Sequence, residues 1–180
     1  MALFIPTILT QGIYAGIIGT ISSVTINSCG LVKSVCTHKN PNVCKIIKEI
    51  DIERRLHLIQ AVINTIDDDF NSTSNTTPIK LDDMEKTQIF ELIGSNTNLL
   101  NDPIELCLIY LHEIIQEINN DLVAINAKVQ YHNTKWFCSW RKLNVAPMLE
   151  NLRINSTLLE DRFNDLTKIS IFLNNKKNWN

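Results

Sequence analysis

The stretch that decides the fold is DPIELCLIYLHEIIQEINNDLVAINAKVQYHNTKW, which runs from Asp102 to Trp136. It begins with an acidic cap, a proline at the first helical position and Glu105 three residues after the cap, a pattern typical of a helix N-terminus. Large residues then recur at alternating spacings of four and three, at Ile104, Leu108, Leu111, Ile115, Ile118, Leu122, Ile125, Val129, His132 and Trp136. Such a 3.5-residue period is typical of coiled coils and helix bundles. The stretch predicts one long heptad-patterned helix over about residues 102–140.

The remainder of the chain also reads as amphipathic helices. Apolar residues at helical spacing predict further helices over residues 10–35, 42–69, 82–93 and 148–173. Short connections between long amphipathic helices imply antiparallel neighbours. We therefore expect an all-α, up-and-down bundle of four to five helices.

The polar segments set the expected boundaries of this bundle. Residues 71–80 (NSTSNTTPIK) are rich in turn-forming side chains and predict a loop. Residues 174–180 predict a polar tail. A chain of 180 residues with 44% hydrophobic residues is long enough for one core. Residues 1–173 are therefore expected to form a single domain.

The N-terminal segment of residues 1–35 carries no Asp, Glu, Lys or Arg before Lys33. Its apolar stripe, which includes Ile13 and Ile17, predicts a helix, and a ridge of small residues flanks the stripe. About 20 predominantly apolar residues are needed to span a bilayer. The window from Gly12 to Val32 is long enough, yet 10 of its 21 residues are Gly, Ser, Thr or Asn.

Three interpretations of this helix stay open. It can be a core helix whose small ridge packs against a neighbouring helix, a helix that is docked until release into a membrane or an oligomer, or a permanent anchor. Small residues spaced four apart favour close helix packing in protein or lipid. The predicted membrane or partner contacts are Gly12, Ile13, Gly16, Ile17, Gly19, Ile21 and Val24.

A cluster of aromatic and basic residues lies near the end of the predicted long helix. Its members are Tyr131, Lys135, Trp136, Trp140 and Arg141. Such a cluster can stack nucleobases or sit at a membrane interface. Because Trp136 falls on the heptad seam, we favour a plug for the end of the bundle core, with an interface cluster as the alternative.

Composition limits the partners and the compartment. A net charge of −2 gives no excess of basic residues to neutralise phosphates, so nucleic acid is not expected as a partner. The 5 cysteines are odd in number and form no CxxC, which favours free thiols in the cytoplasm or another reducing compartment. No basic residue precedes the apolar segment, so a signal peptide is not expected.

No catalytic, cofactor-binding or metal-binding residues are predicted. His112 and Glu113 begin like the zinc-protease motif HExxH, but Gln116 stands where the second histidine is required. We therefore expect His112 to lie on the helix surface. No enzymatic activity and no small-molecule substrate are predicted.

The layout resembles the HeLo and HeLo-like helical modules of cell-death proteins. The features that carry the resemblance are the charge-poor first helix, the run Asp51-Ile-Glu-Arg-Arg-Leu56, a Lys-x-x-Trp-type turn at His132-Asn-Thr-Lys-Trp136 and the final helix from Met148 to Leu173. The chain lacks the charges near the extreme N-terminus that some members carry. The resemblance implies oligomerisation and membrane permeabilisation when the first helix is released.

The functional expectation is therefore a non-enzymatic helical bundle that acts through protein–protein contacts, self-association or a larger assembly. Regulated membrane association through the N-terminal helix is part of this hypothesis. The alternative is a static structural component of a large assembly such as a viral particle.

Overall fold

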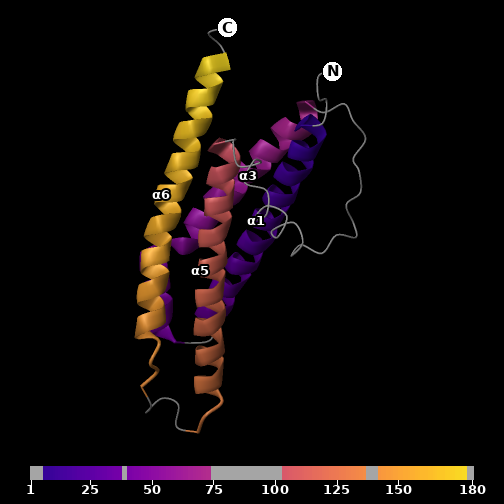
Figure 1. Cartoon of the computed structure of the whole chain (residues 1–180). Coiled ribbons are helices and arrows are strands. Elements are labelled where there is room, and N and C mark those ends of the chain that lie inside the picture. The colour runs from indigo at the N-terminus through magenta and orange to yellow at the C-terminus, as the bar shows by residue number, and fades with distance from the viewer. Residues whose placement is uncertain (1–5, 38–39, 74–102, 137–141, 178–180) are drawn as a thin grey trace.

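The computed structural model describes residues 6–37, 40–73, 103–136 and 142–177, and every regular element within them is a helix. The prediction of an all-α bundle is confirmed (Figure 1). The helices are α1 (Pro6–Thr37), α2 (Pro41–Ile50), α3 (Ile52–Thr73), α5 (Pro103–Asn133) and α6 (Ala146–Lys177). The helix predicted over residues 82–93 lies outside the described residues.

The heptad seam of α5 forms the centre of the core, as its spacing predicts. Between Leu108 and Val129 the seam side chains are completely buried, namely Leu108, Leu111, Ile115, Ile118, Leu122, Ile125 and Val129. α5 packs most extensively against α1 and α6. The long helix therefore pairs within its own chain.

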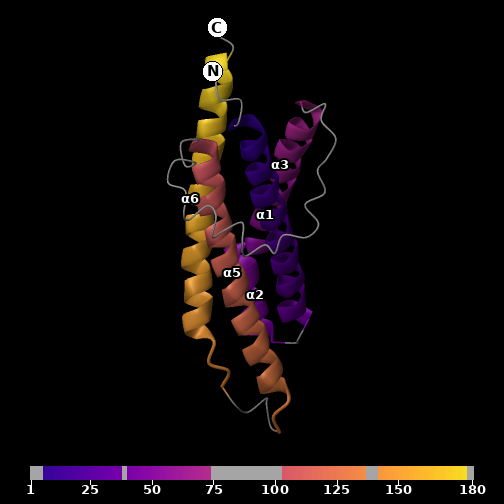
Figure 2. The same ribbon diagram turned by 45° about the vertical axis from the view of Figure 1, so that its right-hand side comes forward.

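The helices run in two opposite directions. In Figure 1, α1 and α5 run downward, and α2, α3 and α6 run upward. Figure 2 shows α1 between α5 and α3. The hydrogen-bonded pairs Asn27–Asn119 and Ser34–Asn126 are both separated by 92 residues in the sequence. Because this offset is constant, α1 and α5 lie side by side as parallel helices, although they are not neighbours in the sequence.

The prediction of a single helix over residues 42–69 is wrong, because the helix is interrupted at Asp51. Asp51 adopts a left-handed conformation with φ 57° and ψ 31°, and its N–H donates to the carbonyl of Lys48. Ile50 is 7% exposed and Ile52 is completely buried. In one continuous helix each residue is rotated by about 100° from the one before it, so Ile50 and Ile52 would be about 200° apart and could not both face the core. The break lets the apolar stripes of both α2 and α3 face the core.

Three other predicted boundaries are also wrong. α3 continues to Thr73, so the first three residues of the predicted loop over 71–80 are helical. α6 continues to Lys177 and includes part of the predicted 174–180 tail, whose lysines favour a helix C-terminus. α5 ends at Asn133 rather than near residue 140, in a tight turn in which the Lys135 N–H donates to the His132 carbonyl at 3.2 Å.

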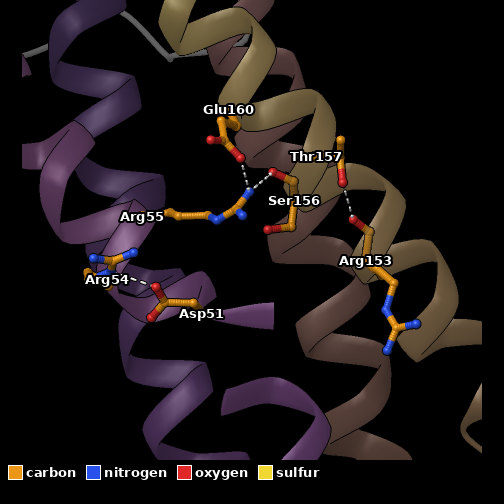
Figure 3. A network of polar contacts seen from close by, with 7 residues as sticks. All are labelled: Asp51, Arg54, Arg55, Arg153, Ser156, Thr157 and Glu160. Carbon is orange, nitrogen blue, oxygen red and sulfur yellow. Dashed lines mark hydrogen bonds and ion pairs between the residues drawn. The ribbon is translucent and has the colours of Figure 1, made fainter. Parts of the chain in front are cut away.

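Arg55 joins α3 to α6 (Figure 3). Its Nη1 donates to the carbonyl oxygen of Ser156 at 2.7 Å and lies 3.0 Å from Glu160 Oε2. Sequence pattern places Arg55 on the solvent side of α3, yet its side chain is only 32% exposed. The pattern of apolar residues could not reveal this contact, because a long guanidinium side chain can reach a neighbouring helix from the edge of the apolar stripe.

Candidate interaction surface on the first helix

The structure divides the predicted contact residues of α1 between two faces. Ile17 is 1% exposed and Ile21 is completely buried in the core. Gly16 and Val24 are half-buried, whereas Gly19 is exposed. Gly12 and Ile13 lie within α1, but their side chains are outside the described part of the structure. The predicted residues therefore do not form one continuous surface.

The inward face of α1 is apolar near the N-terminus and mixed farther along. Its buried side chains are Tyr14, Ile17, Ile18, Ile21, Thr25, Ser28, Cys29, Val32 and Val35. The buried Thr25 hydroxyl donates to the carbonyl of Ile21 at 2.7 Å, which satisfies it within the helix. This face holds α1 against α3 and α5 as a core helix.

Polar side chains connect α1 to α5 at two levels, and we call them the polar ladder: Asn27, Ser28 and Ser34 on α1 with Asn119 and Asn126 on α5. Asn119 Oδ1 accepts from Asn27 Nδ2 at 3.0 Å and lies 3.2 Å from Ser28 Oγ. Ser34 Oγ donates to Asn126 Oδ1 at 3.2 Å. Asn119 is only 9% exposed. A buried asparagine at such a position fixes the register of paired helices.

The polar ladder was not predicted from the sequence, although a signal for it exists. Asn119 and Asn126 are separated by one heptad, and so are Asn27 and Ser34. Polar residues that repeat every seven positions beside an apolar seam indicate that the helix has a second contact face. Asparagines one heptad apart also occur elsewhere in the chain, for example at Asn144 and Asn151, so this spacing alone does not pair α1 with α5.

The outward face of α1 is formed by Ala15, Gly19, Ser23, Ile26 and Gly30. All five residues are exposed, and Ile26 is 64% exposed. A Cβ added at Gly19 or Gly30 would meet nothing within 4 Å. The expectation that the small ridge packs on a neighbouring helix of the same chain is therefore wrong at Gly19. The residues from 15 to 30 carry no charge, so the outward face is an exposed and uncharged surface.

The length and composition of α1 also fit a membrane span. Tyr14–Thr37 is a stretch of 24 residues that is apolar enough to cross a bilayer, and 33% of its apolar window is buried within the bundle. A soluble core helix can pass the same test. The polar ladder and the buried hydroxyls lie on the side of α1 that faces protein.

The described members of the aromatic and basic cluster, Tyr131, Lys135 and Trp136, lie at the end of α5 and do not plug the core. Trp136 is 86% exposed and Tyr131 is 65% exposed. The Lys135 ammonium lies 4.2 Å from the centroid of the Tyr131 ring. Trp136 leaves the seam because the helix ends three residues before it. Trp140 and Arg141 lie outside the described residues.

Burial shifts several titratable groups in the core. His112 is half-buried rather than on the surface as predicted, and burial lowers the pKa of its imidazole. Burial and a hydrogen bond with Cys44 raise the pKa of the Cys36 thiol to about 11. Burial also raises the pKa of the Cys29 thiol. These shifts favour the neutral forms. In the part of the chain that is described, no three His, Cys, Asp or Glu side chains group as metal ligands.

Fold and surface together define an all-α bundle protein whose first helix is buried on one side and exposed, without charge, on the other. Over 170 residues the chain is 48% identical to "Uncharacterized protein L717" of Acanthamoeba polyphaga mimivirus. The alignment covers 94% of this chain and 82% of the mimivirus protein. The chain belongs to the same family as this mimivirus protein. No protein-family model and no solved structure matches the chain.

Proposed function

We propose that the chain is a non-enzymatic helical-bundle protein that acts through protein–protein contacts, as a component of a larger assembly. The observation that carries this proposal is the exposed, uncharged outward face of α1. Charged residues are depleted at the centres of protein–protein interfaces, and this face has none between Ala15 and Gly30. The mimivirus relative is compatible with a part in a virus-encoded assembly.

The energetics of α1 favour protein contact over release into a membrane. Release would expose six buried apolar side chains, namely Tyr14, Ile17, Ile18, Ile21, Val32 and Val35. At about 1.5–3 kcal/mol each, their burial contributes roughly 9–18 kcal/mol. This is comparable with the whole stability of a domain, about 5–15 kcal/mol. Release would also break the polar ladder, so a membrane would have to offset both losses.

Regulated membrane association is the second candidate function. It is favoured by the length and apolar composition of Tyr14–Thr37. It also agrees with the resemblance to HeLo-like modules, in which the first helix would leave the bundle and permeabilise a bilayer. In either case the odd number of cysteines supports a cytoplasmic or other reducing compartment.

Vesicle flotation separates the two candidate functions. The full-length chain is mixed with phospholipid vesicles that contain a trapped dye, with one set zwitterionic and one set partly anionic. Action through protein contacts predicts that the chain stays in the dense fractions with both sets and that the dye is retained. A chain that floats with the vesicles and releases the dye would overturn the proposed function and establish the second candidate.

The variant Ile26→Glu sharpens the flotation experiment. Ile26 is 64% exposed, so a charge there is compatible with the folded bundle but costly inside a bilayer. Ile154→Glu on α6 is the matched control, since Ile154 is 52% exposed. If α1 inserts into lipid, Ile26→Glu reduces flotation and Ile154→Glu does not. If the protein acts through protein contacts, neither variant floats.

A further inference from the structure

We propose that Cys36 and Cys44 form a reversible dithiol–disulfide pair, which ties the C-terminal end of α1 to the start of α2 when the chain meets an oxidising small-molecule disulfide. Cys36 lies in the last turn of α1, and Cys44 lies in the first turn of α2. Both cysteines are free and half-buried. The inference goes beyond the proposed function, because it assigns a chemical modification to a part of the molecule outside the outward face of α1.

The two thiols contact each other between α1 and α2. A hydrogen bond joins the side chains of Cys36 and Cys44. Two cysteines can be bridged without backbone movement only if their side chains converge. Thiols that share a hydrogen bond already point toward each other, so a disulfide requires only a small approach of the two sulfur atoms.

The ends of the two helices hold these thiols in place. Each cysteine follows a buried valine, since Val35 is completely buried and Val43 is 3% exposed. At the start of α2 the Val43 N–H donates to Asn40 Oδ1 at 3.3 Å, and the Cys44 N–H donates to the Asn40 carbonyl at 3.1 Å. The core therefore fixes both cysteines at its edge, where each keeps part of its surface exposed.

The other described cysteines lie elsewhere in the bundle. Cys29 is 8% exposed and precedes Cys36 on α1 by one heptad. At about 1.5 Å per residue the two are about 10 Å apart along the helix, beyond the roughly 7 Å that a disulfide allows between Cα atoms. Cys107 lies on α5, where its thiol is near Asp165 of α6. The contact between Cys36 and Cys44 therefore selects this pair for disulfide formation.

A cavity beside Cys36 gives a small oxidant access to the pair. Its volume is about 440 Å³, which lies within the range of small-molecule sites. Besides Cys36 it is lined by Val32, Lys33, Thr37, Ile47, Lys48, Asp51 and Glu53. Lys33 and Lys48 are exposed, so the cavity is open to solvent between these side chains. The reacting end of a small disulfide can therefore reach the Cys36 sulfur.

The oxidant is a small-molecule disulfide such as oxidised glutathione. The thiolate of one cysteine attacks a sulfur of the oxidant, which forms a mixed disulfide and releases one glutathione thiolate. The thiolate of the other cysteine then attacks the protein sulfur of the mixed disulfide, which forms the Cys36–Cys44 bond and releases the second glutathione. Two protein thiols thus lose two electrons and two protons, and the oxidant gains them as two thiols. Excess reduced glutathione reverses both steps.

The protonation of Cys36 keeps the pair open at neutral pH. Burial and the hydrogen bond with Cys44 raise the pKa of the Cys36 thiol to about 11. The neighbouring charges act in opposite directions, because Lys48 lowers this pKa and Glu53 raises it. Since the thiolate is the nucleophile, closure is expected to be slow at pH 7 and to speed up as the pH rises toward 11.

Peptide mapping of the full-length chain after incubation in glutathione buffers tests this inference. Free thiols are blocked with a maleimide, and the chain is digested with trypsin, which cuts after Lys39 and separates the two cysteines unless a disulfide joins them. We expect a linked Cys36–Cys44 peptide that excess reduced glutathione removes. A second thiol held nearby has an effective concentration of about 1 mM or more, so at about 0.1 mM reduced glutathione the internal disulfide should exceed the mixed disulfide about tenfold or more.

The serine variants and the melting temperature complete the test. Cys36→Ser and Cys44→Ser should each stop at a mixed disulfide, whereas Cys107→Ser, the matched control at another half-buried free thiol, should close like the wild type. Closure should raise the melting temperature of the wild type by about 5–10 °C and leave that of Cys36→Ser unchanged. Mixed disulfides alone, a link from either cysteine to a different one, or an unchanged melting temperature of the oxidised wild type would each overturn the proposal. None of these results affects the proposed function, which fails only if the chain floats with vesicles and releases dye.

Discussion

Replacing Ile21 with alanine is expected to lower the free energy of unfolding by about 2–5 kcal/mol. Ile21 is completely buried on the inward face of α1, where truncation removes apolar contacts and leaves a cavity that the surrounding helices fill only in part. Ile26→Ala on the same helix is the matched control. Because Ile26 is 64% exposed, its truncation should change the stability of the monomer by no more than about 0.5 kcal/mol.

Urea denaturation of both variants, at a concentration where the chain is monomeric, measures this difference. The pair distinguishes a core helix with one free face from a helix that is only loosely attached to the bundle. Equal and small losses for Ile21→Ala and Ile26→Ala would show that the inward face of α1 contributes little to folding. That result would contradict the architecture described above.

The second large effect is expected at the polar ladder. Asn119→Leu removes the acceptor that serves Asn27 and Ser28, and the buried Ser28 hydroxyl is left with only the Val24 carbonyl in its own helix. The Ser28 hydroxyl keeps its 2.9 Å bond to Val24 and the exposed Asn27 amide can turn to water, so each lost hydrogen bond is expected to cost about 0.5–1.5 kcal/mol. Removing both partners costs less than the two single changes suggest, so Asn119→Leu combined with Ser28→Ala should be less destabilising than their sum.

A double-mutant cycle measured by denaturation gives this coupling directly. We expect a coupling energy of about 0.5–3 kcal/mol between residues 28 and 119. Thr65→Ala combined with Asn119→Leu is the control cycle, because the Thr65 hydroxyl is exposed and donates only to the Ala61 carbonyl of its own helix. Additivity of Ser28→Ala and Asn119→Leu within about 0.5 kcal/mol would mean that the ladder does not join α1 to α5 energetically.

The sequence predicts those parts of this fold in which one apolar period runs without interruption. The α5 seam from Leu108 to Val129 is such a part, and every one of its side chains is buried. The interruption of the helix at Asp51 has a weaker signal in the sequence. Ile50 and Ile52 are two residues apart, whereas a continuous apolar stripe on a helix needs spacings of three or four. The exposure of Trp136 could not be predicted, because it depends on the helix ending at Asn133.

The candidate surface is predictable only in part, for a related reason. The absence of charge marks the whole of α1 as a contact helix, but it cannot tell which contacts lie within the chain. Helical spacing does separate Ile17, which falls on the apolar stripe, from Ile26, which lies nine residues later on the opposite side of the helix, and the structure buries the first and exposes the second. Gly19, by contrast, reads as a packing glycine until the structure shows open space around it.

Hydrogen exchange of the α1 backbone amides is the most direct test of the central claim, that α1 is a fixed core helix which presents one free face. Core elements exchange with free energies near that of global unfolding, whereas segments that open alone exchange at lower values. For residues 17–32 in the full-length chain, we predict protection equal to that of the α5 seam, unchanged when vesicles are added. Exchange of α1 at a much lower free energy than α5 would show that the helix opens by itself, and it would contradict this account.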